Sequence, residues 1–243
     1  MLSYNSKSHL IIVPTYNEID NIDKFIEEVF KIDVSLLVVD DNSPDGTSSY
    51  VENIMKTHQK IYLLKRNSKL GLGSAYRDGF KWGLNKGFTH FIEMDADFSH
   101  SFEDLSKILD SSHYSDVVIG SRYISGGGST GWDTKRKILS ITANNLSKLL
   151  LRSKINDMTS GFRCYSRKAL EEIEYFKTNS DGYSFQIEMT IRSIAKGLII
   201  KEVPIIFYER RLGNSKMSKS IVLEALLFLL KNGLKRWLNI KIN

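Results

Sequence analysis

The sequence predicts a single α/β domain with a mostly parallel central sheet flanked by helices, and three observations carry this prediction. The chain has 243 residues, of which 42% are hydrophobic and 26% charged, a composition that can bury one sizeable core. Short apolar runs alternate with segments of helical periodicity, an order typical of right-handed βαβ crossovers. Polar residues follow the apolar runs, where ligands bind beyond the carboxyl ends of parallel strands.

Five apolar runs in the first half of the chain are the expected strands. They cover residues 9–14, 35–40, 60–65, 88–94 and 116–120. The intervening helices are expected at residues 21–30, 47–56, 73–86 and 102–109, with Thr47 placed to cap the second. Beyond residue 125, a glycine cluster precedes a basic helix that begins at Asp133, and a further element covers residues 199–207. Residues 220–240 have the pattern of an amphipathic helix.

The chain carries a formal net charge of +6, an excess that suits nucleic acid, phosphate-bearing substrates or an anionic membrane. The sequence lacks a known nucleic-acid module and bases interleaved with aromatic residues, so nucleic acid is not an expected partner. The lone Cys164 excludes an internal disulfide, indicates a reducing compartment and is expected to be structural. The polar N-terminus lacks the apolar core of a signal peptide, and no apolar run approaches the ~20 residues of a membrane span, which predicts a soluble or peripheral protein.

Asp95 and Asp97 follow an apolar run and flank Ala96. Two carboxylates this close repel each other unless a cation joins them. Mg²⁺ and Mn²⁺ favour such oxygen ligands and complete their coordination with phosphate oxygens and water. The pattern therefore indicates a site for a metal ion with a diphosphate, although a solvated turn is the alternative that Asp-x-Asp alone leaves open. His100, just beyond this pair, is expected to orient the same loop.

Two other strand ends carry weaker signals. Asp40 and Asp41 precede a turn at residues 44–46, and an acid at such a strand end can accept hydrogen bonds from a ribose or a base. Gly71 and Gly73 open a helix, which suits either an anion at the helix N-terminus or simple turn geometry. Neither the Rossmann glycine fingerprint nor a P-loop is present.

Several basic residues are candidates for phosphate binding. Arg122 follows a strand end, and Arg136 lies on a helix with Ser140 one turn later on the same face. Arg210 and Lys216 lie in a polar loop after the last strand. Arginine forms bidentate contacts with phosphate, and lysine supplies a mobile charge. The alternative for each of these residues taken alone is a solvated surface charge without a ligand.

The C-terminal segment combines an apolar run with a basic flank. Residues 221–230 are apolar but too few to span a membrane, and lysines, an arginine and Trp237 follow them. This pattern is typical of a helix that lies in a membrane interface. A buried terminal helix or a partner-binding helix is equally compatible with it.

Ordered motifs along the chain resemble those of one family. They are 14–18 (PTYNE), 40–47 (DDNSPDGT), Gly71-Leu72-Gly73, 95–100 (DADFSH), 120–123 (GSRY), Trp132 with Arg136 and Ser140, 157–165 (DMTSGFRCY), 183–188 (YSFQIE) and 202–216 (EVPIIFYERRLGNSK). Through them the chain resembles the polyprenol (dolichol) phosphate mannose synthases, within the family 2 glycosyltransferases of GT-A fold. The resemblance runs from about residue 10 to 217 and implies a Rossmann-like GT-A domain over residues 8–217. The apolar run with its basic flank predicts an amphipathic helix over residues 218–243, a candidate membrane-interface anchor.

The resemblance also implies a role for each matching position. Donor binding is expected from Pro14, Tyr16, Glu18, Val39, Asp41, Asp95, Ala96, Asp97, Arg122, Arg210 and Lys216, of which the first five hold the nucleoside and the last two close over the diphosphate. The metal ligands would be Asp95, Asp97 and Ser99, the last in a position where some members have Gln. The acceptor phosphate would be bound by Arg122, Arg136 and Ser140, and the catalytic residues would be Asp97, Arg122 and Arg136. Ser101 stands where the family often has Pro, Glu209 where it often has Asp, and Glu188 has no derived role.

The implied reaction is an inverting transfer of mannose from GDP-mannose to dolichyl or polyprenyl phosphate, with Mg²⁺ or Mn²⁺ as cofactor. Transfer of glucose from UDP-glucose to the same lipid and a non-catalytic nucleotide- or membrane-binding scaffold remain as alternatives. A nucleotidyltransferase is a weaker one, because the N-terminus has no glycine-rich nucleotide-binding signature. The lipid implies a peripheral protein on the cytoplasmic face of a membrane, and a small membrane subunit, which some relatives use, is a further candidate partner.

Overall fold

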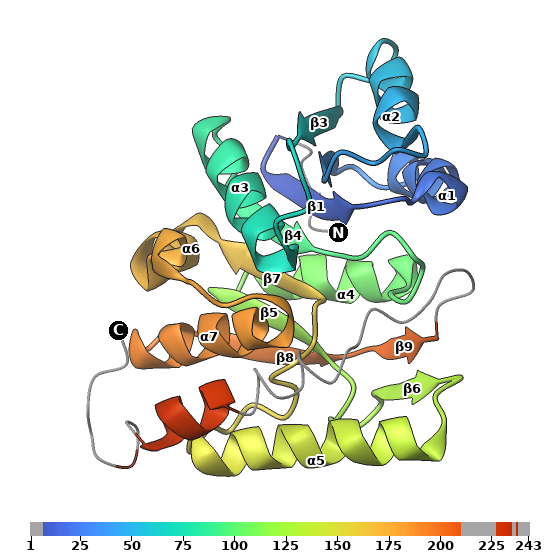
Figure 1. The fold of residues 1–243 in the computed structure, drawn as a ribbon. Coiled ribbons are helices and arrows are strands. Elements are labelled where there is room, and N and C mark those ends of the chain that lie inside the picture. The colour runs from blue at the N-terminus through green and yellow to red at the C-terminus, as the bar shows by residue number, and fades with distance from the viewer. Residues whose placement is uncertain (1–6, 210–226, 235–236, 238–243) are drawn as a thin grey trace.

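The computed structural model describes residues 7–209, 227–234 and 237, and its centre is a seven-stranded sheet (Figure 1). The strands lie in the order β3 (Ile61–Lys65), β2 (Ser35–Asp40), β1 (His9–Thr15), β4 (His90–Glu93), β7 (Arg163–Ser166), β5 (Val117–Ser121) and β8 (Ile200–Pro204). β7 runs antiparallel to both of its neighbours, and the other paired strands of this sheet are parallel. A second, two-stranded parallel sheet joins β6 (Gly128–Thr130) to β9 (Ile206–Tyr208).

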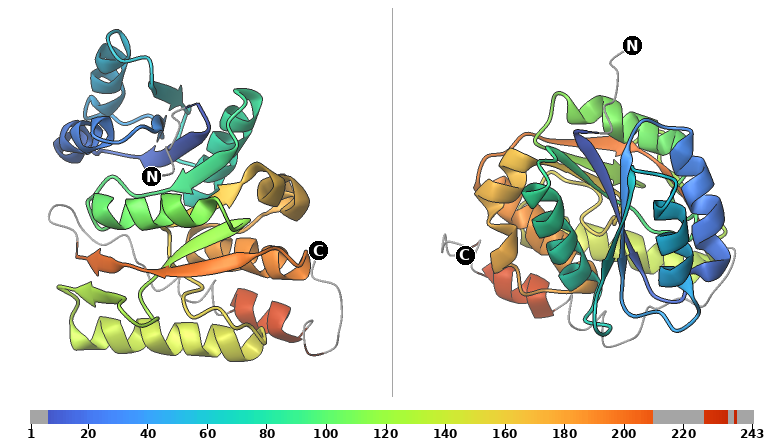
Figure 2. Two further views of the ribbon diagram at one scale, coloured as in Figure 1. Left: turned by 180° about the vertical axis from the view of Figure 1, so that it is seen from behind. Right: turned by 90° about the horizontal axis from the view of Figure 1, so that it is seen from above.

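Helices cover both faces of the large sheet (Figure 2). One face packs against α1 (Ile19–Phe30), α2 (Thr47–Met55) and α4 (Phe102–Ser112). The other face packs against α3 (Leu72–Asn85), α6 (Arg167–Ile173) and α7 (Gly182–Ala195), with the short 3₁₀ helix η1 (Tyr175–Lys177) between the last two in the chain. The long helix α5 (Thr134–Leu150) lies outside these layers, beside residues 227–234 (Figure 1).

The alternation of side chains along β1 explains the two layers. Ile11 and Val13 pack in the core formed with α1, α2 and α4, whereas Leu10 and Ile12 pack in the core formed with α3, α6 and α7. A strand that is covered on both faces needs apolar residues at every position, which is why β1 and β2 are continuous apolar runs in the sequence. The predicted fold class, a single α/β domain with a mostly parallel sheet, is confirmed.

Two local predictions are wrong, and two observed strands, the short β6 and β7, were not predicted. Thr47 does not cap α2, because the N-cap is Gly46 at φ 95° and the Thr47 hydroxyl donates to Asp45 Oδ1 at 2.7 Å instead. The element expected at residues 199–207 is two strands, β8 and β9, which belong to different sheets. β7 has no counterpart among the predicted strands, because its sequence RCYS is not an apolar run.

Residues 227–234 are helical and pack on the domain through one side. Leu229 is buried in a small apolar cluster with Leu151 and Ile187, and the Arg152 guanidinium lies 3.9 Å from the centre of the Trp237 ring. The exposed side carries Leu227, Leu230 and Leu234. The rest of the predicted terminal helix and the domain boundary at residue 217 lie outside the described residues. Within the part of the chain that is described, no helix has the length and apolar character needed to cross a membrane.

Candidate active site

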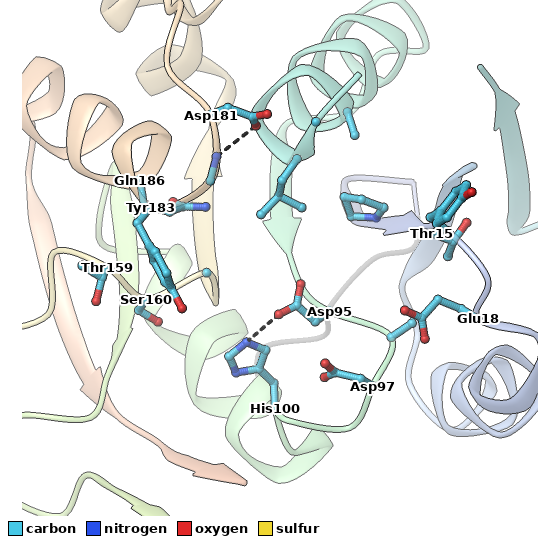
Figure 3. A pocket seen from close by; sticks show the side chains of 18 of the residues that line it. Thr15, Glu18, Asp95, Asp97, His100, Thr159, Ser160, Asp181, Tyr183 and Gln186 are labelled. Atoms are coloured by element: carbon cyan, nitrogen blue, oxygen red, sulfur yellow. Dashed lines mark hydrogen bonds and ion pairs between the residues drawn. The ribbon is translucent and has the colours of Figure 1, made fainter. Parts of the chain in front are cut away.

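A cavity of about 430 Å³ opens at the carboxyl edge of the sheet, bordered by the ends of β1 and β4, the start of α3, the start of α7 and the segment before α5. In Figure 3, Thr15 and Glu18 lie on one side, Tyr183 and Gln186 on the opposite side, and Asp95 and Asp97 between them. Most of the residues expected from the sequence line this cavity: Pro14, Tyr16, Glu18, Asp41, Asp95, Ala96, Asp97, Arg122 and Arg136.

The loops after β1 and β2 form one end of the cavity. Asp40 is fully buried and accepts hydrogen bonds from the hydroxyls of Thr15 (2.8 Å) and Ser43 (2.6 Å), so it holds these loops together. Asp41 lines the cavity instead, and Arg66 lies 3.0 Å from its Oδ1. Burial raises the pKa of Asp41 despite the opposing charge of Arg66, and the neighbouring Asp40 adds to the rise. Of the two adjacent acids, only Asp41 is therefore placed to contact a ligand.

Asp95 and Asp97 follow β4 and bring two carboxylates to the middle of the cavity (Figure 3). The backbone N–H of Ser99 donates to Asp97 Oδ1 at 3.0 Å, and His100 Nε2 lies 3.8 Å from Asp95 Oδ2. Burial lowers the pKa of His100 to about 4, so its ring is neutral near neutral pH. Neutral His100 lines the cavity beside the carboxylates without competing with a cation for them.

These two carboxylates fit a Mg²⁺ or Mn²⁺ ion, since such ions take one or two protein carboxylates and complete their shell with phosphate oxygens and water. Among the described residues, no three His, Cys, Asp or Glu side chains converge into a complete metal site, so a bound diphosphate would have to supply further ligands. Ser99 corrects the sequence-based expectation. Its side chain is fully buried away from the cavity, and the residue supports Asp97 through its backbone N–H.

Arg122 forms a buried ion pair with Asp157 at the cavity wall. Its backbone N–H and Nε donate to Asp157 Oδ2 at 3.0 and 2.7 Å, and its Nη2 donates to Asp157 Oδ1 at 2.7 Å and to Thr159 Oγ1 at 2.9 Å. Burial favours the neutral form of each group, but the attraction between them outweighs it, so the pKa of Asp157 is lowered and that of Arg122 is raised. The guanidinium is therefore charged and held in one orientation.

Arg136 reaches the same wall from α5. The centre of the Trp132 ring lies 5.4 Å from the Arg122 guanidinium carbon and 4.5 Å from that of Arg136, so one indole contacts both cations. Arg136 Nη1 donates to Glu209 Oε1 at 3.0 Å, and both side chains of this pair are partly exposed. The structure thus brings together two arginines that lie fourteen positions apart in the sequence.

Besides Ser99, two expected site residues within the described part of the chain, Val39 and Ser140, do not line the cavity. The Val39 side chain packs into the core against α3, so a contact between Val39 and the nucleoside stays a prediction. Ser140 accepts a hydrogen bond from the Tyr123 hydroxyl at 2.6 Å and does not line the cavity either. Arg210 and Lys216 lie outside the described residues, so their roles stay predictions.

Sequence reasoning assigned no role to several residues that build the site. Asp157 lies in a recognised motif, but its partner is 35 positions away, a pairing that no local pattern reveals. Glu188 accepts hydrogen bonds from the Ser180 backbone (3.2 Å) and from Arg192 Nε (3.0 Å), so it supports the loop before α7. Further lining residues without an assigned role are Lys69, Thr159, Ser160, Asp181, Tyr183, Gln186 and Phe207.

The chain matches the model of one protein family over most of its length. That family is described as "Glycosyl transferase family 2", and the match covers residues 10–174. The chain belongs to glycosyl transferase family 2. Its α/β fold and the carboxylates at the end of β4 are those expected of a GT-A glycosyltransferase.

Two curated relatives of this glycosyltransferase are similar over nearly its whole length. "Polyprenol monophosphomannose synthase" of Mycolicibacterium smegmatis is 45% identical over 221 residues, which cover 89% of this chain and 83% of the relative. "Undecaprenyl-phosphate mannosyltransferase" of Micrococcus luteus is 42% identical over 233 residues, which cover 94% and 95%. Among solved structures, "Mannosyltransferase PcManGT from Pyrobaculum calidifontis in complex with GDP-Man and Mn2+" has a TM-score of 0.57 at 15% identity, covers 97% of this chain and 75% of that one, and supports the fold alone.

Proposed function

We propose that this family 2 glycosyltransferase transfers mannose from GDP-mannose to a polyprenyl phosphate, with inversion at the anomeric carbon. The observation that carries the proposal is a single cavity lined by two carboxylates, Asp95 and Asp97, and two arginines, Arg122 and Arg136. The carboxylates can bind a metal ion together with the donor diphosphate. The arginines can bind a second phosphate, that of the acceptor, without a metal ion. The names of the two relatives support mannose as the sugar and a polyprenyl phosphate as the acceptor.

The donor side of the reaction depends on stabilising a leaving nucleoside diphosphate. Asp95 and Asp97 would hold a Mg²⁺ or Mn²⁺ ion, which would supply positive charge to that leaving group. The hydrogen bond from Ser99 fixes Asp97 before the donor arrives, so little reorganisation is needed on binding. Arg210 and Lys216 are proposed to close over the same diphosphate.

The acceptor side needs positioning rather than a strong base. A phosphate monoester has a second pKa of about 6 and is therefore a ready anionic nucleophile near neutral pH. Nε and Nη2 of Arg122 are bound to Asp157 and Thr159, whereas its Nη1 makes no hydrogen bond to the described residues and can donate to the acceptor phosphate. Arg136 can exchange its exposed partner Glu209 for the same phosphate, which aligns the attacking oxygen.

The lipid acceptor requires a membrane surface, and α5 with the adjoining C-terminal segment is the surface that we propose. The exposed apolar residues here are Ile138, Leu139, Ile141, Leu149, Leu227, Leu230, Leu234 and Trp237. Lys135 and Lys137 add charge that attracts anionic headgroups, and Arg136 of the cavity lies on the same helix. We therefore propose peripheral attachment to the cytoplasmic face of a membrane, in agreement with the single cysteine. A small membrane subunit over this surface is the alternative.

A transfer assay tests the proposed reaction. It would use radiolabelled GDP-mannose or UDP-glucose, a short-chain polyprenyl phosphate, and Mg²⁺ or Mn²⁺. We expect mannolipid from GDP-mannose, no product in EDTA, and a fall of roughly 100-fold or more in Asp97→Asn, because that carboxylate holds the metal. Asp110→Asn removes an exposed carboxylate outside the cavity and should keep full activity.

The other outcomes separate the alternatives. Glucolipid from UDP-glucose would keep the chemistry and correct the donor. Nucleotide binding without turnover, in the presence of anionic vesicles and either metal, would favour a scaffold and contradict the enzymatic proposal. Equal recovery of the chain with anionic and neutral vesicles would contradict the electrostatic part of the membrane surface.

A further inference from the structure

We infer that Asp181 recognises the donor sugar, with its carboxylate accepting hydrogen bonds from hydroxyl groups of the hexose. This inference rests on the proposed function and names a residue that recognises the sugar of the donor. Asp181 precedes α7 and lines the cavity. Figure 3 shows it on the side of Tyr183 and Gln186, across the cavity from Thr15 and Glu18, where the nucleoside is expected.

The carboxylate of Asp181 is fixed by the first turn of α3. Its Oδ1 accepts hydrogen bonds from the backbone N–H groups of Gly73 and, at 2.9 Å, Gly182. The Gly73 N–H is one of the donors that a helix N-terminus leaves without a partner inside the helix, and an anionic acceptor is favourable there. One oxygen of Asp181 is thus committed to holding the side chain in place.

The second oxygen of Asp181 lies where Gly71 leaves room for it. A Cβ at Gly71 would fall 1.6 Å from Asp181 Oδ2, and the backbone of Gly71 has a φ of +96°, so only glycine fits both demands. A Cβ at Gly73 would fall 2.8 Å from the Ser180 carbonyl oxygen. The Gly71-Leu72-Gly73 motif is therefore explained by close approach of the segment that carries Asp181.

The loop that presents Asp181 is anchored from two further sides. Arg77 Nη1 on α3 donates to the Ser180 carbonyl at 3.1 Å. Glu188 on α7 accepts from the Ser180 N–H at 3.2 Å and pairs with Arg192 at 3.0 Å. A residue held in this way offers its free acceptor sites in a preset position, as selective hydrogen bonding to a ligand requires.

The chemistry of Asp181 selects a hydroxyl-bearing ligand group. An ionised carboxylate only accepts hydrogen bonds, whereas a diphosphate has no donor and would repel it. Asp181 also does not form a ligand set with Asp95 and Asp97, because the described residues contain no group of three metal-ligating side chains. The hydroxyls of the hexose and of the ribose remain, and the position of Asp181 across from Thr15 and Glu18 favours the hexose.

The test compares donor binding with and without the sugar in wild type and in Asp181→Asn. Asparagine keeps the shape and can still accept from Gly73 through its oxygen, so the fold should be retained and the melting temperature should stay close to that of wild type. We expect calorimetry with Mn²⁺ to give a GDP affinity within about 2-fold of wild type, and kcat/KM for GDP-mannose to fall about 10- to 100-fold, the range for a lost hydrogen bond to a charged acceptor. Asp110→Asn is the matched control.

Single-deoxy analogues of GDP-mannose identify the hydroxyl. With wild type, at least one analogue should have a lower kcat/KM than GDP-mannose. With Asp181→Asn, the same analogue should have a kcat/KM equal to that of GDP-mannose, because the contact to the missing hydroxyl is already absent in the variant.

Two outcomes would overturn the inference: an equal weakening of GDP and GDP-mannose, which would indicate a ribose contact or a structural role, or deoxy penalties that are unchanged in Asp181→Asn. Failure of the proposed function looks different, because wild type itself would then make no mannolipid. The comparison of GDP with GDP-mannose binding still tests Asp181 in that case.

Discussion

Two fully buried carboxylates lie behind the cavity, and their surroundings give them opposite charge behaviour. Asp157 accepts three hydrogen bonds from Arg122, and its pKa is lowered because this attraction outweighs the effect of burial. Glu93 accepts one hydrogen bond from the Gln186 amide, at 2.7 Å, and burial raises its pKa to about 8. Burial is the same for both residues, so the difference lies in the partner.

Arg163 shows why Glu93 lacks such a partner. The two residues are paired across β4 and β7, so a guanidinium is close at hand. Its N–H groups, however, donate to the carbonyl oxygens of Ser160, Gln186 and Met158 and to the Thr190 hydroxyl. The charge of Arg163 lowers the pKa of Glu93 only partly, because no direct ion pair is formed. A cation stabilises a buried carboxylate fully only when its hydrogen bonds are directed at that carboxylate.

The largest effect on stability is expected from Asp157→Ala. Removing this carboxylate leaves the buried Arg122 cation unpaired, and the loss should be about 3–5 kcal/mol in the free energy of unfolding. Urea denaturation measures it. The double variant Arg122→Leu/Asp157→Leu should recover part of the lost stability, because neither charge is then buried, but it should remain inactive. If Asp157→Ala unfolded at the same urea concentration as wild type, the ion pair with Asp157 would not be what holds Arg122 in its orientation.

Glu93→Gln should have a smaller effect that depends on pH. The folded state of wild type holds the Glu93 proton up to about pH 8, whereas the unfolded chain releases it near the ordinary pKa of 4.5. The folded state therefore binds more protons between these values, and stability is lost as the pH rises from 4.5 through about 8. Glutamine resembles the protonated acid, so the variant should not show this loss of stability with rising pH.

Thermal unfolding of both proteins across this pH range measures the difference. The histidines and the other carboxylates titrate in both chains, so their contributions cancel in the comparison. Parallel stability curves for wild type and Glu93→Gln would mean that Glu93 is already ionised in the folded state, and the contrast with Asp157 would then disappear.

Parts of the fold and of the site can be predicted from the sequence because their signals are local in the chain. β1 and β2 are predictable because both of their faces are covered, which forces every position to be apolar. Asp95 and Asp97 are predictable because the carboxyl ends of parallel strands meet at one edge of the sheet. Both signals are local in the chain.

The remaining parts of the site depend on contacts between distant segments. The pairing of Arg122 with Asp157, the support of Asp181 by Gly73 and the bond between Glu93 and Gln186 join residues that are 35, 108 and 93 positions apart. β7 forms from the polar sequence RCYS because two strands already flank it. The burial of Ser99 likewise follows from packing, which its position two residues after Asp97 does not reveal.

The smallest effect on stability is expected at the exposed counterpart of the buried pair, Arg136 with Glu209. Partly exposed ion pairs contribute about 0–1 kcal/mol, so Arg136→Ala should leave the melting temperature nearly unchanged. Its effect should fall on the acceptor instead, with KM for polyprenyl phosphate raised roughly 10-fold and GDP affinity kept, because a charge-assisted contact to phosphate is lost. Initial rates at varied acceptor concentration, with calorimetry for GDP, measure both quantities. Glu209→Gln frees Arg136 from its partner and is the matched control, which should not raise this KM. If Arg136→Ala lost as much stability as Asp157→Ala, or lost GDP binding, Arg136 would have a structural role like that of Arg122. The distinction between a buried, structural arginine and an exposed, acceptor-binding one would then be wrong.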